Sequence, residues 1–195
     1  RIPDMSTYPT INPPIIDKCE GKFKPYERDL ERWARRWAVP GTAGLEHRVG
    51  GLEKAENGSV SSDPLNHELM VANRAEKVAR VANYIPDLEV MGNQEGDVLV
   101  VGWGGTYGHL YTATKELLAA GKNVGFAHFD YINPLPKNTA DVFRKFKKII
   151  VCELNSGQFV NYLRGVYPEF AFEQLNKVQG QPFIVKEIVD AVNAL

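Results

Sequence analysis

The sequence predicts an α/β fold, in which a mainly parallel sheet lies between two layers of helices and follows an N-terminal extended and helical arm. The main observation is that apolar strands alternate with helices from Asp97 to the end of the 195-residue chain. The segments Val98–Val101 and Ile149–Val151 are apolar throughout, as in parallel sheets that are buried on both faces. The arm is expected because residues 1–26 are rich in proline and have no sustained hydrophobic period.

The first predicted helix covers residues 26–37. Apolar residues recur there at helical spacing and place Trp33 and Trp37 on one face, and Pro40 follows the pattern. A glycine-rich linker is expected over residues 41–62.

A long helix is predicted over residues 63–84, because Asp63 can cap its N-terminus and Pro64 suits the first helical position. Beyond it, strands and helices alternate. Strands are predicted at 97–103, 123–129, 148–153 and 172–178, and helices at 107–120, 139–146, 157–164 and 182–194.

The composition disfavours polyanionic partners. Lys and Arg total 23 and Asp and Glu total 24, which gives a net charge of -1 and no strong field to attract nucleic acid or an anionic membrane. No apolar run approaches the roughly 20 residues of a membrane-spanning helix. Cys19 and Cys152 fit no metal or disulfide framework, which favours the reducing cytoplasm. The chain begins with Arg1 rather than Met, so it is expected to be a piece of a longer product.

A glycine-rich turn, GWGGTYG at residues 102–108, joins the first strand of this alternation to its helix. Such glycines let a phosphate approach the backbone at a helix N-terminus. Asp130 ends the next strand, where a dinucleotide-binding domain holds a ribose hydroxyl, so a Rossmann-type nucleotide site is one interpretation. A tight turn that packs against its neighbours is favoured, because Gly108 lies one position too late for G-x-G-x-x-G.

Polar segments also follow the next two strands. Residues 130–136 form a proline-shaped loop in which Tyr131 is expected to touch a substrate or another subunit. After the third strand, Asn155 or Ser156 is predicted to cap the following helix.

The residues predict no catalytic group and no metal site. Cys152 has no histidine that can be placed as its base, and the four histidines lack zinc-binding spacing. His128 lies within a strand and is expected to be buried and hydrogen-bonded. The charged triplet at residues 46–48 lies in a glycine-rich loop, where a solvated loop is favoured over a site.

Several segments, taken in order, resemble one protein family. They are GLEHRVGGLE at 44–53, DPLNH at 63–67, VVGWGGTYG at 100–108, YINPLP at 131–136, ELNSGQ at 153–158 and LNKVQG at 175–180. These segments are similar to motifs of the alpha subunit of 2-oxoacid:ferredoxin oxidoreductases, especially the 2-oxoglutarate type. The resemblance runs from about residue 41 to residue 195.

The resemblance implies a domain plan for the chain. Residues 97–195 would form a three-layer α/β/α transketolase C-terminal-like domain, and residues 63–96 a linking helix. Residues 1–62 would be the tail of the pyrimidine-type thiamine diphosphate domain together with a linker. The family's substrate-recognition segment has no counterpart here, so the fragment is expected to be inactive alone.

The resemblance also implies the reaction and its partners. The whole enzyme would decarboxylate a 2-oxoacid oxidatively to an acyl-CoA and reduce ferredoxin, using thiamine diphosphate, Mg, an iron–sulfur cluster and coenzyme A. No cofactor is expected in this fragment. The beta subunit and the other alpha-subunit domains would be its direct partners, with ferredoxin reached through the complex.

Two groups of residues follow as candidate sites. An anion or coenzyme A rim would use Gly102, Gly104, Gly105, Thr106, Asn155 and Ser156. A subunit interface would use Glu46, His47, Arg48, Tyr131 and Pro134. Two alternatives stay open: a Rossmann-type nucleotide-binding protein, and the same family acting on pyruvate or a branched 2-oxoacid.

Overall fold

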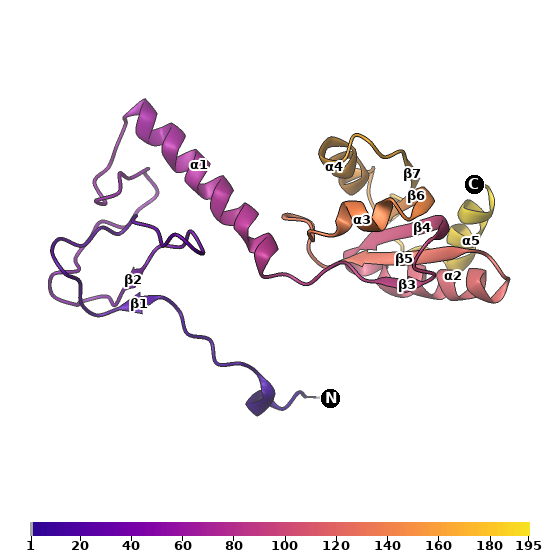
Figure 1. Ribbon diagram of the computed structural model, residues 1–195, viewed down its shortest axis with the longest axis horizontal. Helices are drawn as coiled ribbons and strands as arrows, with labels where there is room; N and C mark the ends of the chain where they lie inside the picture. Colours follow the sequence, from indigo (N-terminus) through magenta and orange to yellow (C-terminus); the bar gives the residue numbers. More distant parts are fainter. Residues whose placement is uncertain (1) are drawn as a thin grey trace. The chain divides into compact units, whose positions relative to one another are not determined.

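The computed structural model describes residues 2–195, and the chain divides into two compact units, one up to Val81 and one from Ala82 to Leu195 (Figure 1).

The C-terminal unit is built on a five-stranded sheet with the strand order β3-β5-β4-β6-β7. All neighbouring strands pair in parallel except β3, which is antiparallel to β5. The strands are β3 (Val90–Gly92), β4 (Gly96–Trp103), β5 (Val124–Phe129), β6 (Phe146–Glu153) and β7 (Phe172–Asn176).

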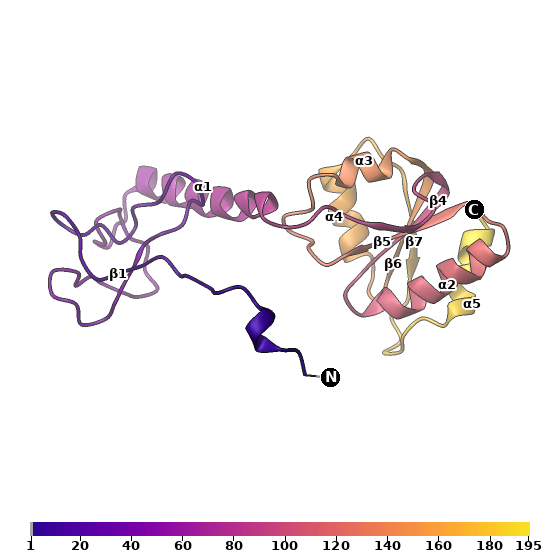
Figure 2. The same cartoon turned by 60° about the horizontal axis from the view of Figure 1, so that its bottom comes forward.

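Two helices cover each face of the sheet, so the predicted three-layer α/β/α arrangement with a mainly parallel sheet is confirmed (Figure 2). One layer contains α2 (Tyr107–Ala119) and α5 (Val185–Asn193). The other contains α3 (Thr139–Phe143) and α4 (Gln158–Val166).

Alternating side chains of the central strands form two cores, one under each helical layer. In β4, Val98 and Val100 face α2 and α5, whereas Leu99 and Val101 face α3 and α4. This is the period of two that a strand imposes. Because both faces are covered, the strand reads as a continuous apolar run, which is why the sequence revealed it.

The edge strand β3 was not predicted. It has only three residues, Val90–Gly92, and its partner β5 lies more than thirty positions along the chain. The segment before it is held by Asn138, whose side chain accepts from Leu88 N–H at 2.8 Å and donates to Leu88 C=O at 3.0 Å. The sheet therefore has one antiparallel edge, and this edge forms part of the pocket described below.

The N-terminal unit contains one long helix, α1 (Pro64–Arg80), packed with irregular chain. The predicted cap is present, since the Asp63 side chain accepts from Leu65 N–H at 2.9 Å. The helix continues as the 3₁₀ turn η2 (Val81–Asn83), which lies across the unit boundary. The remaining regular elements are η1 (Met5–Thr7) and two short parallel strands, β1 (Ile15–Ile16) and β2 (Trp37–Ala38).

The helix predicted over residues 26–37 is wrong. Asp29 is the cause, because its carboxyl oxygens accept from the backbone N–H groups of Glu31, Arg32 and Ala34 and hold a turn instead. Trp33 adopts a positive φ of 59°. The two tryptophans consequently do not share a helical face.

Trp33 is tied to α1, whereas Trp37 is exposed. The indole of Trp33 donates to the Asn73 side chain at 3.0 Å and lies under the Arg80 guanidinium at 4.4 Å. No helix among residues 2–195 is long and apolar enough to cross a membrane.

Candidate functional site

The carboxyl ends of β4, β5 and β6 lie at one edge of the sheet, because these strands are mutually parallel. Ligands of open α/β sheets bind at this edge. The glycine turn follows β4, the proline-shaped loop follows β5 and residues 154–157 follow β6. The topology thus brings the predicted rim segments to the same side of the domain.

The first glycine of the turn is required for packing. A Cβ at Gly102 would lie 2.1 Å from Leu110 Cδ1 and 2.7 Å from Thr106 Oγ1, so α2 can sit this close to β4 only with glycine there. The Thr106 hydroxyl is buried and donates to Trp103 C=O at 2.9 Å. Both contacts fit the tight-turn interpretation of this segment.

The next part of the turn is open. A Cβ at Gly104 or Gly105 would meet nothing within 4 Å, and Gly104 has a positive φ of 57° that favours glycine. Thr106, the residue before α2, makes no capping hydrogen bond with its side chain. No side chain caps the first turn of α2, which continues directly from the 3₁₀ turn η3 (Gly104–Thr106).

The first turn of α4 is capped from within the domain. Asn155 Oδ1 accepts from Gly157 N–H at 2.8 Å and Gln158 N–H at 2.9 Å, which confirms its predicted capping role. The fully buried Glu153 accepts from Phe159 N–H and Val160 N–H at 2.8 and 2.9 Å. Ser156 is exposed. These contacts leave Asn155 committed to the helix.

Trp103 and Cys152 are structural residues at this edge. The Trp103 indole donates to Glu153 at 3.3 Å and packs on Phe159. Cys152 is fully buried, and burial raises the pKa of its thiol to about 12. A thiolate nucleophile at Cys152 is disfavoured, in agreement with the sequence analysis.

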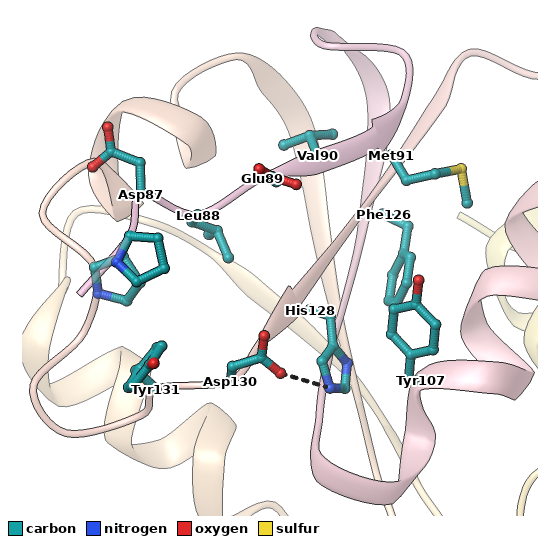
Figure 3. Close-up of a pocket in the computed structure, with 12 residues that line it drawn as sticks. Asp87, Leu88, Glu89, Val90, Met91, Tyr107, Phe126, His128, Asp130 and Tyr131 are labelled. Carbon is teal, nitrogen blue, oxygen red and sulfur yellow. Dashed lines mark ion pairs between the residues drawn. The ribbon is translucent and has the colours of Figure 1, made fainter. Parts of the chain in front are cut away.

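A pocket of about 600 Å³ lies beside the β5 end and was not predicted (Figure 3). Its apolar wall comes from β3 and β5, through Val90, Met91 and Phe126. Its polar lining includes the carboxylates of Asp87 and Glu89 and the pair His128 and Asp130. Figure 3 shows His128 near Tyr107 of α2. The lining residues are Pro86, Asp87, Leu88, Glu89, Val90, Met91, Tyr107, Phe126, His128, Asp130, Tyr131 and Pro136.

The pocket could be anticipated only in part. Residues 126, 128 and 130 alternate along β5 and its end, so the sequence places them on one face. The opposite wall depends on β3, whose pairing is long-range and carries no local signal.

The surroundings of the His128 side chain differ in part from those expected from the sequence. The residue is only partly buried, with 12% of its side chain exposed, and its Nδ1 is buried with no hydrogen-bond partner. Its Nε2 lies 3.8 Å from Asp130 Oδ1, which is too long for a hydrogen bond. The expected hydrogen-bonded histidine is therefore wrong, because the strand places the ring against Tyr107 at 5.1 Å, edge to face.

Burial lowers the pKa of His128 from 6.5, although the nearby Asp130 opposes this shift. The imidazole is consequently neutral at neutral pH. The unpartnered Nδ1 is buried, and Nε2 is the ring nitrogen that faces Asp130.

The predicted interface residues are divided between the two units. Tyr131 and Pro134 lie on the loop after β5, where Tyr131 is 44% exposed and lines the pocket. Glu46, His47 and Arg48 are exposed in the N-terminal unit. Glu46 accepts from Gly44 N–H at 2.9 Å, and the His47 ring packs edge-on against Phe23. Among residues 2–195, no group of three His, Cys, Asp or Glu side chains could hold a metal ion.

Known proteins with similar sequences are longer than this chain, and no family model matches it. It is 41% identical over 190 residues to the 2-oxoglutarate oxidoreductase subunit KorA of Mycobacterium tuberculosis, covering 96% of this chain and 28% of that protein. It is 27% identical over 179 residues to the alpha subunit of 2-oxoacid:ferredoxin oxidoreductase 1 of Aeropyrum pernix. That match covers 88% of this chain and 28% of that protein.

A solved structure matches nearly the whole chain. It is 2-oxoglutarate:ferredoxin oxidoreductase from Magnetococcus marinus with 2-oxoglutarate, coenzyme A and succinyl-CoA bound, at 32% identity and a TM-score of 0.86. The match covers 98% of this chain and 34% of that one. The chain thus spans about a third or less of these relatives.

Proposed function

Since this chain belongs to the alpha-subunit family of 2-oxoacid:ferredoxin oxidoreductases, we propose that it is the carboxyl-terminal portion of such a subunit in an enzyme acting on 2-oxoglutarate. The observation that carries the proposal is the match at a TM-score of 0.86 over 98% of the chain. The name of that structure includes 2-oxoglutarate, which favours this substrate over pyruvate or a branched 2-oxoacid.

The proposed reaction of the whole enzyme is oxidative decarboxylation of the 2-oxoacid with coenzyme A, giving an acyl-CoA, CO2 and reduced ferredoxin. Thiamine diphosphate with Mg supplies the chemistry of decarboxylation, and iron–sulfur clusters carry single electrons. The residues of this chain do not fit a cluster, because Cys19 and Cys152 fall short of the four thiolates that one requires. We therefore assign these cofactors to the beta subunit and to the rest of the enzyme. The proposed location of the enzyme is the cytoplasm.

The proposed role of this chain is assembly and shaping of the active-site entrance. The exposed loop with Tyr131 and Pro134, next to the 600 Å³ pocket, suits a contact with the beta subunit or another alpha-subunit domain. Glu46, His47 and Arg48 supply a second contact surface of exposed polar groups.

A coenzyme A or anion contact is proposed at the glycine turn. The open space at Gly104 and Gly105 lets an anion approach the first turn of α2, where no side chain forms a cap. Thr106 holds this turn through its hydrogen bond to Trp103 C=O, and Gly102 allows α2 to pack closely against β4. Of the other rim residues, Ser156 is exposed, whereas Asn155 already caps α4.

A Rossmann-type nucleotide-binding protein is the less favoured alternative. Gly102 is required for the packing of α2 against β4, and the Asp130 side chain is 81% exposed beside His128. Calorimetric titration separates the two proposals, because NAD or NADP binding would support a nucleotide-binding protein, whereas coenzyme A binding fits the oxidoreductase.

The decisive experiment is reconstitution. The chain alone is expected to show no 2-oxoglutarate-dependent dye reduction, and the complete subunit with its beta partner is expected to show it. The matched control is the alpha subunit from which these 195 residues have been deleted. It should fail to assemble with the beta subunit in size-exclusion chromatography. Turnover by the isolated chain would overturn the proposal.

A further inference from the structure

A cavity of about 300 Å³ lies in the N-terminal unit, and five cationic side chains contribute to its lining. It is distinct from the glycine turn and from the pocket at His128. Its lining includes the charged residues Arg28, Arg35, Lys54, Arg74, Lys77 and Glu53.

The backbone forces two of these cations together. Arg28 and Arg35 are directly opposite in an isolated antiparallel bridge. Like charges in this position repel each other and destabilise the pair. Arg35 lies over the Tyr26 ring at 4.4 Å and donates to Pro25 C=O at 3.4 Å.

Arg28 has unused hydrogen-bonding capacity inside the unit. The terminal nitrogen Nη1 of Arg28 donates to Trp33 C=O at 3.3 Å, but the Nε of Arg28 is buried with no partner. Burial, together with the positive charges of Arg35 and Arg74, lowers the pKa of Arg28. A buried guanidinium donor without an acceptor is costly.

The one lining carboxylate does not neutralise the site. Glu53 accepts from Arg74 at 2.7 Å and also from His67, so two basic side chains already share it. Lys54 is almost fully buried and donates to the carbonyls of Gly50 and Leu52. Positive charge is thus concentrated around this cavity in a chain whose net charge is -1.

We propose that this cavity binds a phosphate group of a small-molecule ligand, with Arg28, Arg35 and Lys77 as its cationic contacts. A phosphate dianion matches the charge excess better than a single carboxylate. Arginine guanidinium groups offer paired N–H donors that suit phosphate oxygens. The volume of about 300 Å³ suits a phosphate or a diphosphate rather than a macromolecule.

Titration calorimetry of the 195-residue chain with inorganic pyrophosphate at low ionic strength tests the proposal. One binding site per chain is expected. Arg28→Gln should weaken binding about tenfold, which corresponds to ~1.4 kcal/mol. Repeating the titration on the complete subunit with its beta partner checks that the cavity remains accessible in the enzyme.

Lys77→Gln keeps the test valid if Arg28→Gln fails to fold, because Lys77 is an exposed residue of α1. It should weaken pyrophosphate binding by a smaller factor, about threefold. The matched control is Lys22→Gln, which removes the same charge from an exposed position outside the lining and should leave binding unchanged.

Three outcomes would overturn the proposal. They are no pyrophosphate binding, equal affinity in the Lys77→Gln variant and the unmodified chain, and equal binding of succinate. The last would show a general attraction for carboxylates instead of a phosphate site. These results are independent of 2-oxoglutarate turnover, so they do not depend on the proposed function.

Discussion

Glu153 links the end of β6 to the start of α4 through a single buried carboxyl group. It accepts from two backbone N–H groups of the helix, at Phe159 and Val160, and from the Trp103 indole. One side chain thereby fixes a helix N-terminus and the ring that flanks the glycine turn. At this edge of the sheet, Glu153 therefore supports the turn and the helix that follow the strands.

Replacing Glu153 with alanine is expected to lower the free energy of unfolding by about 2–4 kcal/mol, because buried N–H donors lose their acceptor. Urea denaturation followed by circular dichroism measures the change. The exposed Glu169 provides the matched control, since Glu169→Ala should shift stability by less than about 0.5 kcal/mol. Similar losses in both variants would contradict the assigned role of Glu153.

His128 should make stability depend on pH. Burial lowers its pKa in the folded chain below 6.5, so the unfolded chain binds more protons at acidic pH. The free energy of unfolding should therefore fall as pH drops below about 6.5 toward the lowered pKa. Denaturation should be measured at about pH 7.5 and about pH 5.5. Between these two pH values, the free energy of unfolding should fall less for His128→Gln than for the unmodified chain. Parallel profiles would contradict this.

The helix α2 packs closely against β4 because residue 102 is a glycine. Gly102→Ala would force its Cβ into Leu110, and we expect a loss of about 1–3 kcal/mol in unfolding free energy. Gly108→Ala is the matched control on the same turn. It adds the same methyl group to a helical position with open space, and should stabilise by about 0.5–1 kcal/mol. Thermal denaturation distinguishes the two.

The sequence revealed those elements whose signals are local. The apolar run at 98–101 and the cap at Asp63 predicted β4 and α1 because burial on both faces and helix capping leave direct traces in composition. The segment at 26–37 was misassigned because helical spacing was judged without the competing side chain of Asp29. Long-range pairing hid β3, and with it one wall of the His128 pocket.

At the scale of the whole chain, the two units differ in how much core they contain. Among residues 2–81, the buried hydrophobic side chains are Phe23, Leu45 and Met70. The C-terminal unit has two extensive cores, one on each face of its sheet. Most of the stability of the chain is therefore expected to reside in the C-terminal unit.

Residues 82–195 are expected to fold on their own, because both helical layers and all five strands of the main sheet lie within this range. Their thermal midpoint should lie within a few degrees of the main transition of the full chain. Limited proteolysis of the full chain should cut within residues 1–81 first. Cleavage that begins inside the sheet would contradict the assignment of stability.

The burial of Cys152 also makes the natural cysteines useful as reporters. Its thiol is inaccessible and protonated at neutral pH, whereas Cys19 is partly exposed in the other unit. A maleimide dye should therefore attach to the folded chain at one position without any engineering. Delayed labelling at Cys152 would then time the opening of the sheet, and the fluorescence at Cys19 would report separately on the N-terminal unit.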